Sequence, residues 1–194
     1  MREVHFISQV EAEKLAPVAG AAMISITDPD KPEAALGDWQ LLYRDSFYDG
    51  GYSEDTIRTM KGSFRMNYAS YIDSCQAKNL SRFIDELVLS GISQIFVHCY
   101  YGESRSGAIA LYLCNKHGFT PNKPITKPNR TVYDLLSFPS KYESLIQSYE
   151  SHNIAPTTDI YTPTLHDALP ISPRHTWAGY RQGQTAYCLL FTVY

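Results

Sequence analysis

The sequence is poor in cysteine, in long apolar runs and in charge of one sign, and each shortage excludes a class of protein. Its 194 residues include four cysteines, none in the close pairs typical of a zinc site or a disulfide framework. No apolar run approaches the roughly 20 residues that a membrane helix needs. The formal net charge is -3 and the two signs are interspersed, so the basic stripe of a nucleic-acid binder is missing.

What is present is the composition of a folded domain. Apolar residues make up 44% and charged residues 19%, a balance that disordered chains lack. The first residues do not combine a basic region with an apolar stretch, so we expect a cytoplasmic protein without a membrane attachment. We also expect a monomer that binds no nucleic acid.

The order of apolar patterns predicts the fold class. Short apolar runs indicate buried strands at residues 4–7, 21–26, 40–43 and 95–97. Helical spacing or composition predicts helices over residues 9–16, 80–88, 106–117, 132–136 and 141–149. Residues 52–76 are polar and aromatic with weak periodicity, which favours a long loop or lid carrying a short helix. The alternation predicts an α/β fold with a central, mainly parallel sheet of four to five strands flanked by helices.

The segment between the last predicted strand and the apolar helix carries the chemistry. Cys99 follows the strand, five residues intervene, and Arg105 opens the helix. Such a loop can turn its backbone N–H groups toward one phosphate, and Gly102 permits the tight bend. The positive end of the helix adds to this attraction and favours the thiolate form of the cysteine. The predicted phosphate-binding residues are Tyr100, Tyr101, Gly102, Glu103, Ser104 and Arg105.

Arg105, Ser106 and Cys99 have complementary roles in this hypothesis. The planar guanidinium can grip two phosphoryl oxygens, which a lysine would do less well. The hydroxyl of Ser106 can donate a hydrogen bond to the sulfur and make it a better leaving group. The alternative is a buried structural cysteine next to a surface arginine. Strand, cysteine, glycine, arginine, serine and apolar helix occur together, which favours the catalytic interpretation.

Residues 98–106 resemble the HCxxGxSRS signature of dual-specificity protein phosphatases. Residues 83–85 and 128–135 resemble flanking segments of that family, while residues 24–29 and 47–49 look like a bacterial and phage group of predicted tyrosine phosphatases. The resemblance covers roughly residues 3 to 150. It implies a protein tyrosine phosphatase-like fold and a cysteine-dependent hydrolysis of a phosphorylated protein or small phosphoester. In that reaction Cys99 forms a phosphocysteine that water hydrolyses, without a metal or other cofactor.

The resemblance also implies a general acid, since the family protonates the leaving oxygen with an aspartate on a loop before the central helix. The candidates are Asp45, Asp49, Asp55 and Asp73. We choose Asp49, because it follows a predicted strand and matches an FDD-like segment of the related group. It lies further from the nucleophile in sequence than is usual for the family, so another candidate could fold back instead. Each is otherwise an ordinary solvated loop residue.

Four further residues are expected to support the loop. The resemblance implies that Asn129 hydrogen-bonds the loop backbone; the alternative is an ordinary turn asparagine. His98 is expected to orient the loop from behind, unless it is only a core histidine. Tyr100 and Tyr101 are expected to line the mouth and to pack on an aromatic phosphoester.

Two alternatives to an active phosphatase remain. A chain whose aspartates do not reach the loop would be a catalytically weak phosphate-binding module, or pseudophosphatase. Sulfur transfer or arsenate reduction on a similar loop is the other, and the SRS ending argues against it. The discriminating feature is the place of the aspartate carboxylates.

The character of the sequence changes near Tyr161. Residues 165–172 look like the translation of a sequencing-adapter oligonucleotide. We therefore expect a phosphatase domain over residues 1–159 and a non-native or disordered tail over residues 160–194. The alternative is a genuine but unusual extension.

Overall fold

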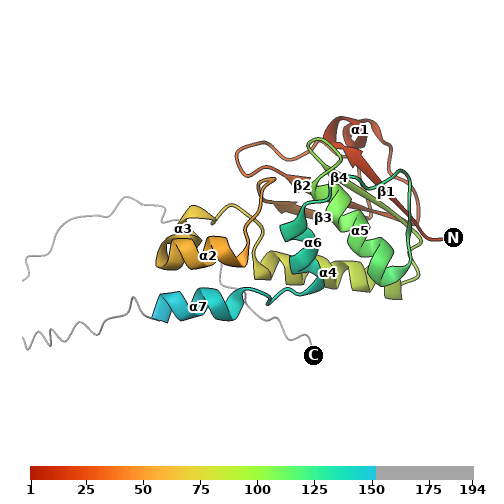
Figure 1. Ribbon diagram of the computed structural model, residues 1–194. Helices are drawn as coiled ribbons and strands as arrows, with labels where there is room; N and C mark the ends of the chain where they lie inside the picture. Colours follow the sequence, from red (N-terminus) through yellow and green to blue (C-terminus); the bar gives the residue numbers. More distant parts are fainter. Residues whose placement is uncertain (152–194) are drawn as a thin grey trace, which may run out of the picture. The chain divides into compact units, whose positions relative to one another are not determined.

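The computed structural model describes residues 1–151, in which five parallel strands form one sheet (Figure 1). The strands run in the order β3-β2-β4-β1-β5. Their bounds are Glu3–Ser8 (β1), Ala21–Thr27 (β2), Leu41–Ser46 (β3), Gln94–Cys99 (β4) and Thr120–Pro121 (β5). This confirms the predicted α/β fold with a central parallel sheet. The predicted tail, residues 160–194, lies outside the described residues.

Helices cover both faces of the sheet. They are α1 (Gln9–Lys14), α2 (Glu54–Met60), the 3-10 turn η1 (Lys61–Ser63), α3 (Phe64–Asn67), α4 (Ser74–Leu89), α5 (Arg105–His117), α6 (Arg130–Ser137) and α7 (Glu143–Ser151). Helix α1 lies on one side, and α4, α5 and α6 lie on the other (Figure 1).

Alternation along the strands sends side chains to two different cores. On the face under α4 to α6, Ile24, Val97 and Cys99 belong to a large apolar cluster. On the opposite face, Met23 and Phe96 pack with Ala12 of α1 in a smaller cluster. Because β2 and β4 are buried on both faces, most of their residues are apolar and do not alternate with polar ones.

Residues 52–76 correct the prediction of a long loop or lid. They contain α2, η1, α3 and the first turn of α4. The side chain of Tyr52 is buried and packs its ring against Phe64, Tyr68 and Tyr142. An aromatic cluster drawn from several short elements has no single helical period, so the pattern gave little sign of it.

Two strands also differ from the prediction. β3 continues three residues beyond Tyr43, through Arg44, Asp45 and Ser46. These polar residues gave no apolar pattern, because neither face of the strand is completely buried, so the second half of β3 was not predicted. The short β5 was missed, since it has two residues and one is a proline.

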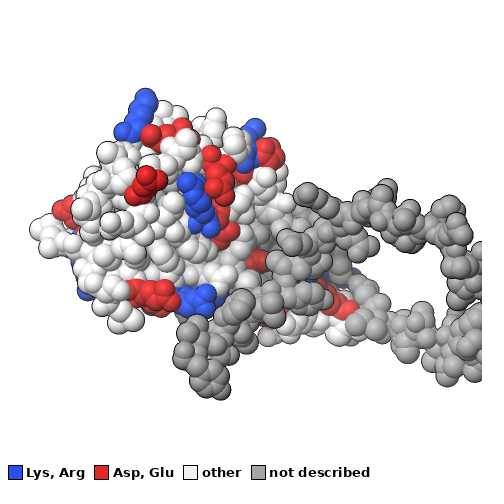
Figure 2. Space-filling model, turned by 180° about the vertical axis from the view of Figure 1, so that it is seen from behind, with Lys and Arg blue, Asp and Glu red and all other residues white. Residues whose placement is uncertain are grey.

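The surface seen in Figure 2 carries acidic and basic side chains close to one another, with neutral areas between them. No helix within residues 1–151 is both long enough and apolar enough to cross a bilayer.

Candidate active site

The site lies at the edge where β2, β3 and β4 end. Parallel strands place their carboxyl ends at one edge, and ligands of open α/β sheets bind there. The segment after β4 is the predicted phosphate loop, residues 99–105, which leads into α5. The segments after β2 and β3 supply further polar groups to this loop.

Cys99 ends β4 with its side chain in the larger core, and 1% of the residue is exposed. Its Sγ lies 3.3 Å from the Oγ of Ser106, in the first turn of α5. That serine is completely buried. The structure therefore brings together the predicted nucleophile and the hydroxyl predicted to serve it.

Gly102 determines how closely the loop approaches β1. Its φ is 72°, in the left-handed region that favours glycine. A Cβ at this position would lie 2.3 Å from the carbonyl carbon of Ile7 and from the amide nitrogen of Ser8. A side chain is excluded here by backbone atoms, which cannot move aside as a flexible side chain would.

The phosphate loop presents unused donors. Within the described residues, no backbone hydrogen bond is donated by residues 101–104. Ser104 is the N-cap of α5, and its side chain makes no capping hydrogen bond. Helix α5 also has no acidic residue in its first turn. Free N–H groups and an uncapped helix end form a site for an anion.

Arg105 is held firmly although it is a charged residue with 1% exposure. Its Nη1 donates to the carbonyl oxygens of Phe47, at 2.5 Å, and Thr27, at 3.2 Å. The same nitrogen lies 2.7 Å from Oδ1 of Asp28. Its Nε is buried and has no hydrogen-bond partner within residues 1–151. One edge of the guanidinium is anchored, and the Nε–H remains available to a ligand.

Asp49 is the predicted acid that the structure places beside the loop. Its Oδ1 accepts a hydrogen bond of 2.8 Å from the hydroxyl of Ser104 and one of 3.0 Å from Nδ2 of Asn129. The residue is exposed, so it can meet both solvent and a leaving group.

Asn129 ties the loop, the acid and α6 together. Its side-chain amide donates to Asp49 and, at 2.8 Å, to the carbonyl oxygen of Gly50. Its own backbone N–H donates to the carbonyl of Ser104, at 3.0 Å. Its Oδ1 accepts from Val132 as the N-cap of α6. Its contact with the loop backbone thus runs through its main chain, while its side chain holds the acid segment.

The other three candidate acids have contacts elsewhere. Asp45 accepts hydrogen bonds from Tyr43, Gln76 and its neighbour Ser46, and burial raises the pKa of its carboxyl. Asp73 is the N-cap of α4. Asp55 is exposed in the first turn of α2, where its negative charge interacts favourably with the helix dipole. Each has a structural role in its own segment.

His98 lies behind the loop on the opposite face of β4 from Cys99. It is completely buried, and its Nε2 lies 2.7 Å from the hydroxyl of Ser25 on β2. Burial, and after it the positive charge of Arg44, lowers the pKa of the imidazole to about 4. His98 is therefore a neutral ring at ordinary pH, packed between two strands.

Three loop residues face outward. Tyr100 is 49% exposed and Tyr101 is 75% exposed, and their rings meet edge to face with centroids 4.8 Å apart. Glu103 is exposed as well. These side chains border the unused backbone N–H groups of the loop and do not contribute to that set of donors.

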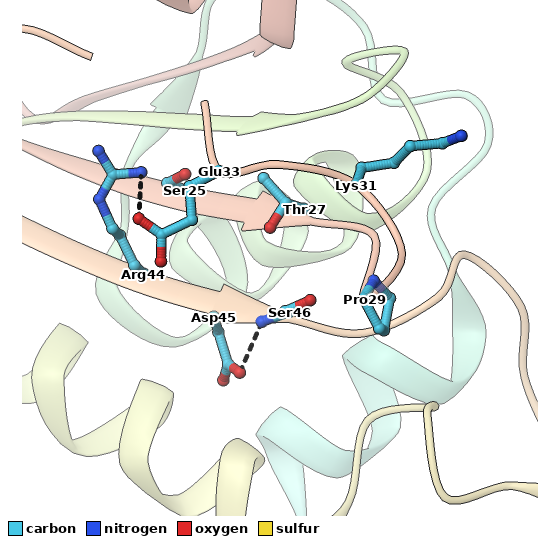
Figure 3. Close-up of a pocket in the computed structure, with 8 residues that line it drawn as sticks. All are labelled: Ser25, Thr27, Pro29, Lys31, Glu33, Arg44, Asp45 and Ser46. Atoms are coloured by element: carbon cyan, nitrogen blue, oxygen red, sulfur yellow. Dashed lines mark hydrogen bonds and ion pairs between the residues drawn. The ribbon is translucent and has the colours of Figure 1, made fainter. Parts of the chain in front are cut away.

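A pocket of about 290 Å³ lies beside the ends of β2 and β3 (Figure 3). Arg44 and Glu33 form an ion pair of 3.5 Å across it, and the side chain of Asp45 points to the other side of β3. Its lining residues are Ser25, Thr27, Pro29, Lys31, Glu33, Arg44, Asp45 and Ser46.

Asp28 is the residue that sequence reasoning missed. It follows β2 directly, and the rule that ligands bind at the carboxyl edge of a parallel sheet, applied to the Thr27-Asp28-Pro29 turn, would have pointed to it.

No group of three or more His, Cys, Asp or Glu residues within the described range is arranged to hold a metal ion. Neither the protein-family models nor the curated proteins compared with this chain match it.

Proposed function

We propose that the protein is a phosphomonoesterase that hydrolyses phosphotyrosine or related phosphoesters through a phosphocysteine. The observation that carries this proposal is the state of Arg105. A buried guanidinium is anchored through Nη1 while its Nε has no partner, in the first turn of a helix that follows a buried cysteine. A phosphate dianion supplies an acceptor for this Nε–H and for the unused N–H groups of the loop.

Each step of the reaction has a group to perform it. The thiolate of Cys99 attacks phosphorus, and the P–O bond to the leaving group breaks. Asp49 gives its proton to the departing oxygen and then takes a proton from the water that attacks the phosphocysteine. The S–P bond breaks, inorganic phosphate leaves, and the hydroxyl of Ser106 stabilises the released thiolate.

The finer attributes belong to the same proposal. Exposed Tyr100 and Tyr101 beside the cradle support an aromatic phosphoester as substrate. A reactive thiolate fits the reducing cytoplasm, where we propose that the protein acts as a monomer. The place of Asp49 next to Ser104 supports an active enzyme over a phosphate-binding module without an acid.

The test is hydrolysis of p-nitrophenyl phosphate by the wild type and by Cys99→Ser. We expect turnover by the wild type, none by the variant, and a phosphate adduct on Cys99 after acid quenching, detected by mass spectrometry. Cys114→Ser is the matched control, because this partly buried cysteine lies in the same helix region away from the loop. Turnover that survives in Cys99→Ser, or is absent from the wild type, refutes the proposal.

A further inference from the structure

Asp28 forms an ion pair with the buried side chain of Arg105. Within residues 1–151 its carboxylate is the one that lies within ion-pair distance of Arg105, with Oδ1 at 2.7 Å from Nη1. The side chain of Asp28 is 21% exposed, and that of Arg105 is 2% exposed. A pair shielded on its cationic side interacts more strongly than an ion pair on the open surface.

The three acceptors around Nη1 do different things. This nitrogen has two hydrogens, and the shortest contacts are those with Phe47, at 2.5 Å, and Asp28, at 2.7 Å. The carbonyl of Thr27, at 3.2 Å, shares one of them. The carbonyls are fixed by the backbone, but they carry no charge. Of these three acceptors only Asp28 carries a negative charge to oppose that of the buried guanidinium.

The position of the contact matters as much as its charge. Every hydrogen bond that Arg105 makes within the described residues is made by Nη1. The Nε–H and one Nη2–H of a guanidinium point in parallel and form the fork that receives two oxygens of a phosphate. A carboxylate that holds Nη1 therefore fixes the plane of the group and keeps that fork available.

We propose that Asp28 is a positioning residue, which holds Arg105 through Nη1 so that Nε and Nη2 are presented to a phosphate. The inference rests on the proposed phosphatase function and deepens it. Asp28 transfers no proton in the reaction; it acts through the arginine.

Asp28 has two opposite effects on phosphate binding. The direction in which the affinity changes when its charge is removed therefore tests the inference. As a negative charge near an anion site, Asp28 repels phosphate, so its neutralisation alone would tighten binding. As a positioning residue it holds the fork in place, so its neutralisation weakens binding. We expect positioning to dominate, because a charge-assisted bidentate contact depends steeply on geometry.

The decisive measurement is the affinity of inorganic phosphate for Asp28→Asn, by calorimetry and by the shift of the melting temperature that phosphate causes. The variant keeps the size of the side chain and removes its charge. We expect binding about tenfold weaker than in the wild type. Asp30→Asn, an exposed charge change in the same turn, is the matched control and should bind like the wild type.

The outcomes separate the two proposals. A wild type that binds no phosphate refutes the phosphate site itself. A wild type that binds, with Asp28→Asn binding as well or better, overturns the role of Asp28 alone. If Asp28→Asn does not fold, Asp28→Glu replaces it: the charge remains but the carboxylate is displaced, so weaker binding supports positioning and unchanged binding overturns it.

A series of aryl phosphates distinguishes positioning from proton transfer. A positioning residue lowers kcat/KM by about the same factor for good and poor leaving groups, since each substrate presents the same phosphoryl group. We expect Asp28→Asn to show this uniform loss of about tenfold and to keep the pH profile of the wild type. A loss confined to poor leaving groups would make Asp28 an acid and overturn the inference.

Discussion

The segments that follow β2 and β3 each bring one aspartate to the phosphate loop, yet they hold it in opposite ways. Asp28, after β2, is mostly buried and faces a cation. Asp49, after β3, is exposed and accepts hydrogen bonds from two neutral groups, Ser104 and Asn129. The carboxylate of Asp28 is engaged by a buried guanidinium, whereas that of Asp49 lies at the surface between neutral donors, open to water and to a leaving group. This contrast supports our proposal that the first segment serves phosphate binding and the second serves proton transfer.

The sharpest test of this division is Asp49→Asn. We expect kcat for a phosphoester with a poor leaving group to fall by about 100-fold or more, since a general acid contributes on that scale. The loss should be much smaller for a nitrophenyl ester, whose leaving group needs little protonation. Steady-state rates from pH 5 to 8 would show whether the limb of the profile that reports the acid disappears.

Asp55→Asn is the control for the acid. Asp55 is exposed on α2 and was one of the alternatives to Asp49 in the sequence. It should leave both the rate and the pH profile unchanged. An effect of Asp55→Asn equal to that of Asp49→Asn would remove the assignment of the acid to the segment after β3.

A second test concerns the buried side chain of His98, which lies next to β2. His98 is neutral there, with its pKa lowered by burial to about 4 from an ordinary value of 6.5. Above pH 6.5 neither the folded nor the unfolded state binds the proton. As the pH falls toward 4 only the unfolded state gains it, so His98 should lower the free energy of unfolding by about 3 kcal/mol across this window.

Urea unfolding at pH 7 and pH 5 checks this expectation in the wild type and in His98→Gln. The variant should lose less stability than the wild type on going to pH 5. It keeps some pH dependence, since burial also lowers the pKa of His117. His5→Gln is the control on β1. Equal losses for wild type and His98→Gln would show that the imidazole is not held neutral.

The fold was predictable from the sequence because its central strands are buried on both faces. Residues 21–26 are apolar except for Ser25 and residues 95–97 are apolar throughout, and a short apolar run bounded by turns has few other interpretations. The helical pattern was equally plain in α5, whose C-cap is Gly118, a glycine with a φ of 70°. The segment from Tyr52 to Asp73 was misread, since it packs through contacts of the Tyr52 ring with Phe64 of α3 and with Tyr142, just before α7, rather than through a periodic face.

The site was only partly predictable, for a different reason. Cys99, Arg105 and Ser106 lie in one continuous loop and helix, so their spacing already places them together. The contacts of Asp28 with Arg105 and of Asp49 with Asn129 join residues far apart in sequence. Four aspartates near the predicted loop were chemically equivalent in the sequence, and only the sheet edge and α6 distinguish them.

A third test asks whether the segment after β3 is held by contact with α6. Thr131 accepts a hydrogen bond from the N–H of Tyr52 and donates one to its carbonyl, at 3.0 and 3.1 Å. A Cβ on Gly51 would lie 2.3 Å from the hydroxyl oxygen of Thr131. We expect Gly51→Ala to lower the free energy of unfolding by about 2 kcal/mol, as overpacking does, and to reduce activity by displacing Asp49.

The control is a double-mutant cycle with Thr131→Ala, measured by thermal unfolding. Removing the hydroxyl relieves the clash, so the double variant should be more stable than the sum of the two single losses predicts. Strict additivity would mean that Gly51 does not touch α6, and that Ser104 and Asn129 position Asp49 without this contact.

The smallest expected effect tests whether charge holds the segment after β2. Glu33 pairs with Arg44 at 3.5 Å but is 72% exposed, and Arg44 also donates to the carbonyl of Ala34, at 3.1 Å. Glu33→Gln should therefore change the free energy of unfolding by less than about 0.5 kcal/mol, the usual scale for exposed pairs. Urea unfolding at low and high salt measures it. A loss above about 1 kcal/mol that salt abolishes would show that electrostatic attraction, rather than the packing of Trp39 against Phe96, holds this segment and with it Asp28.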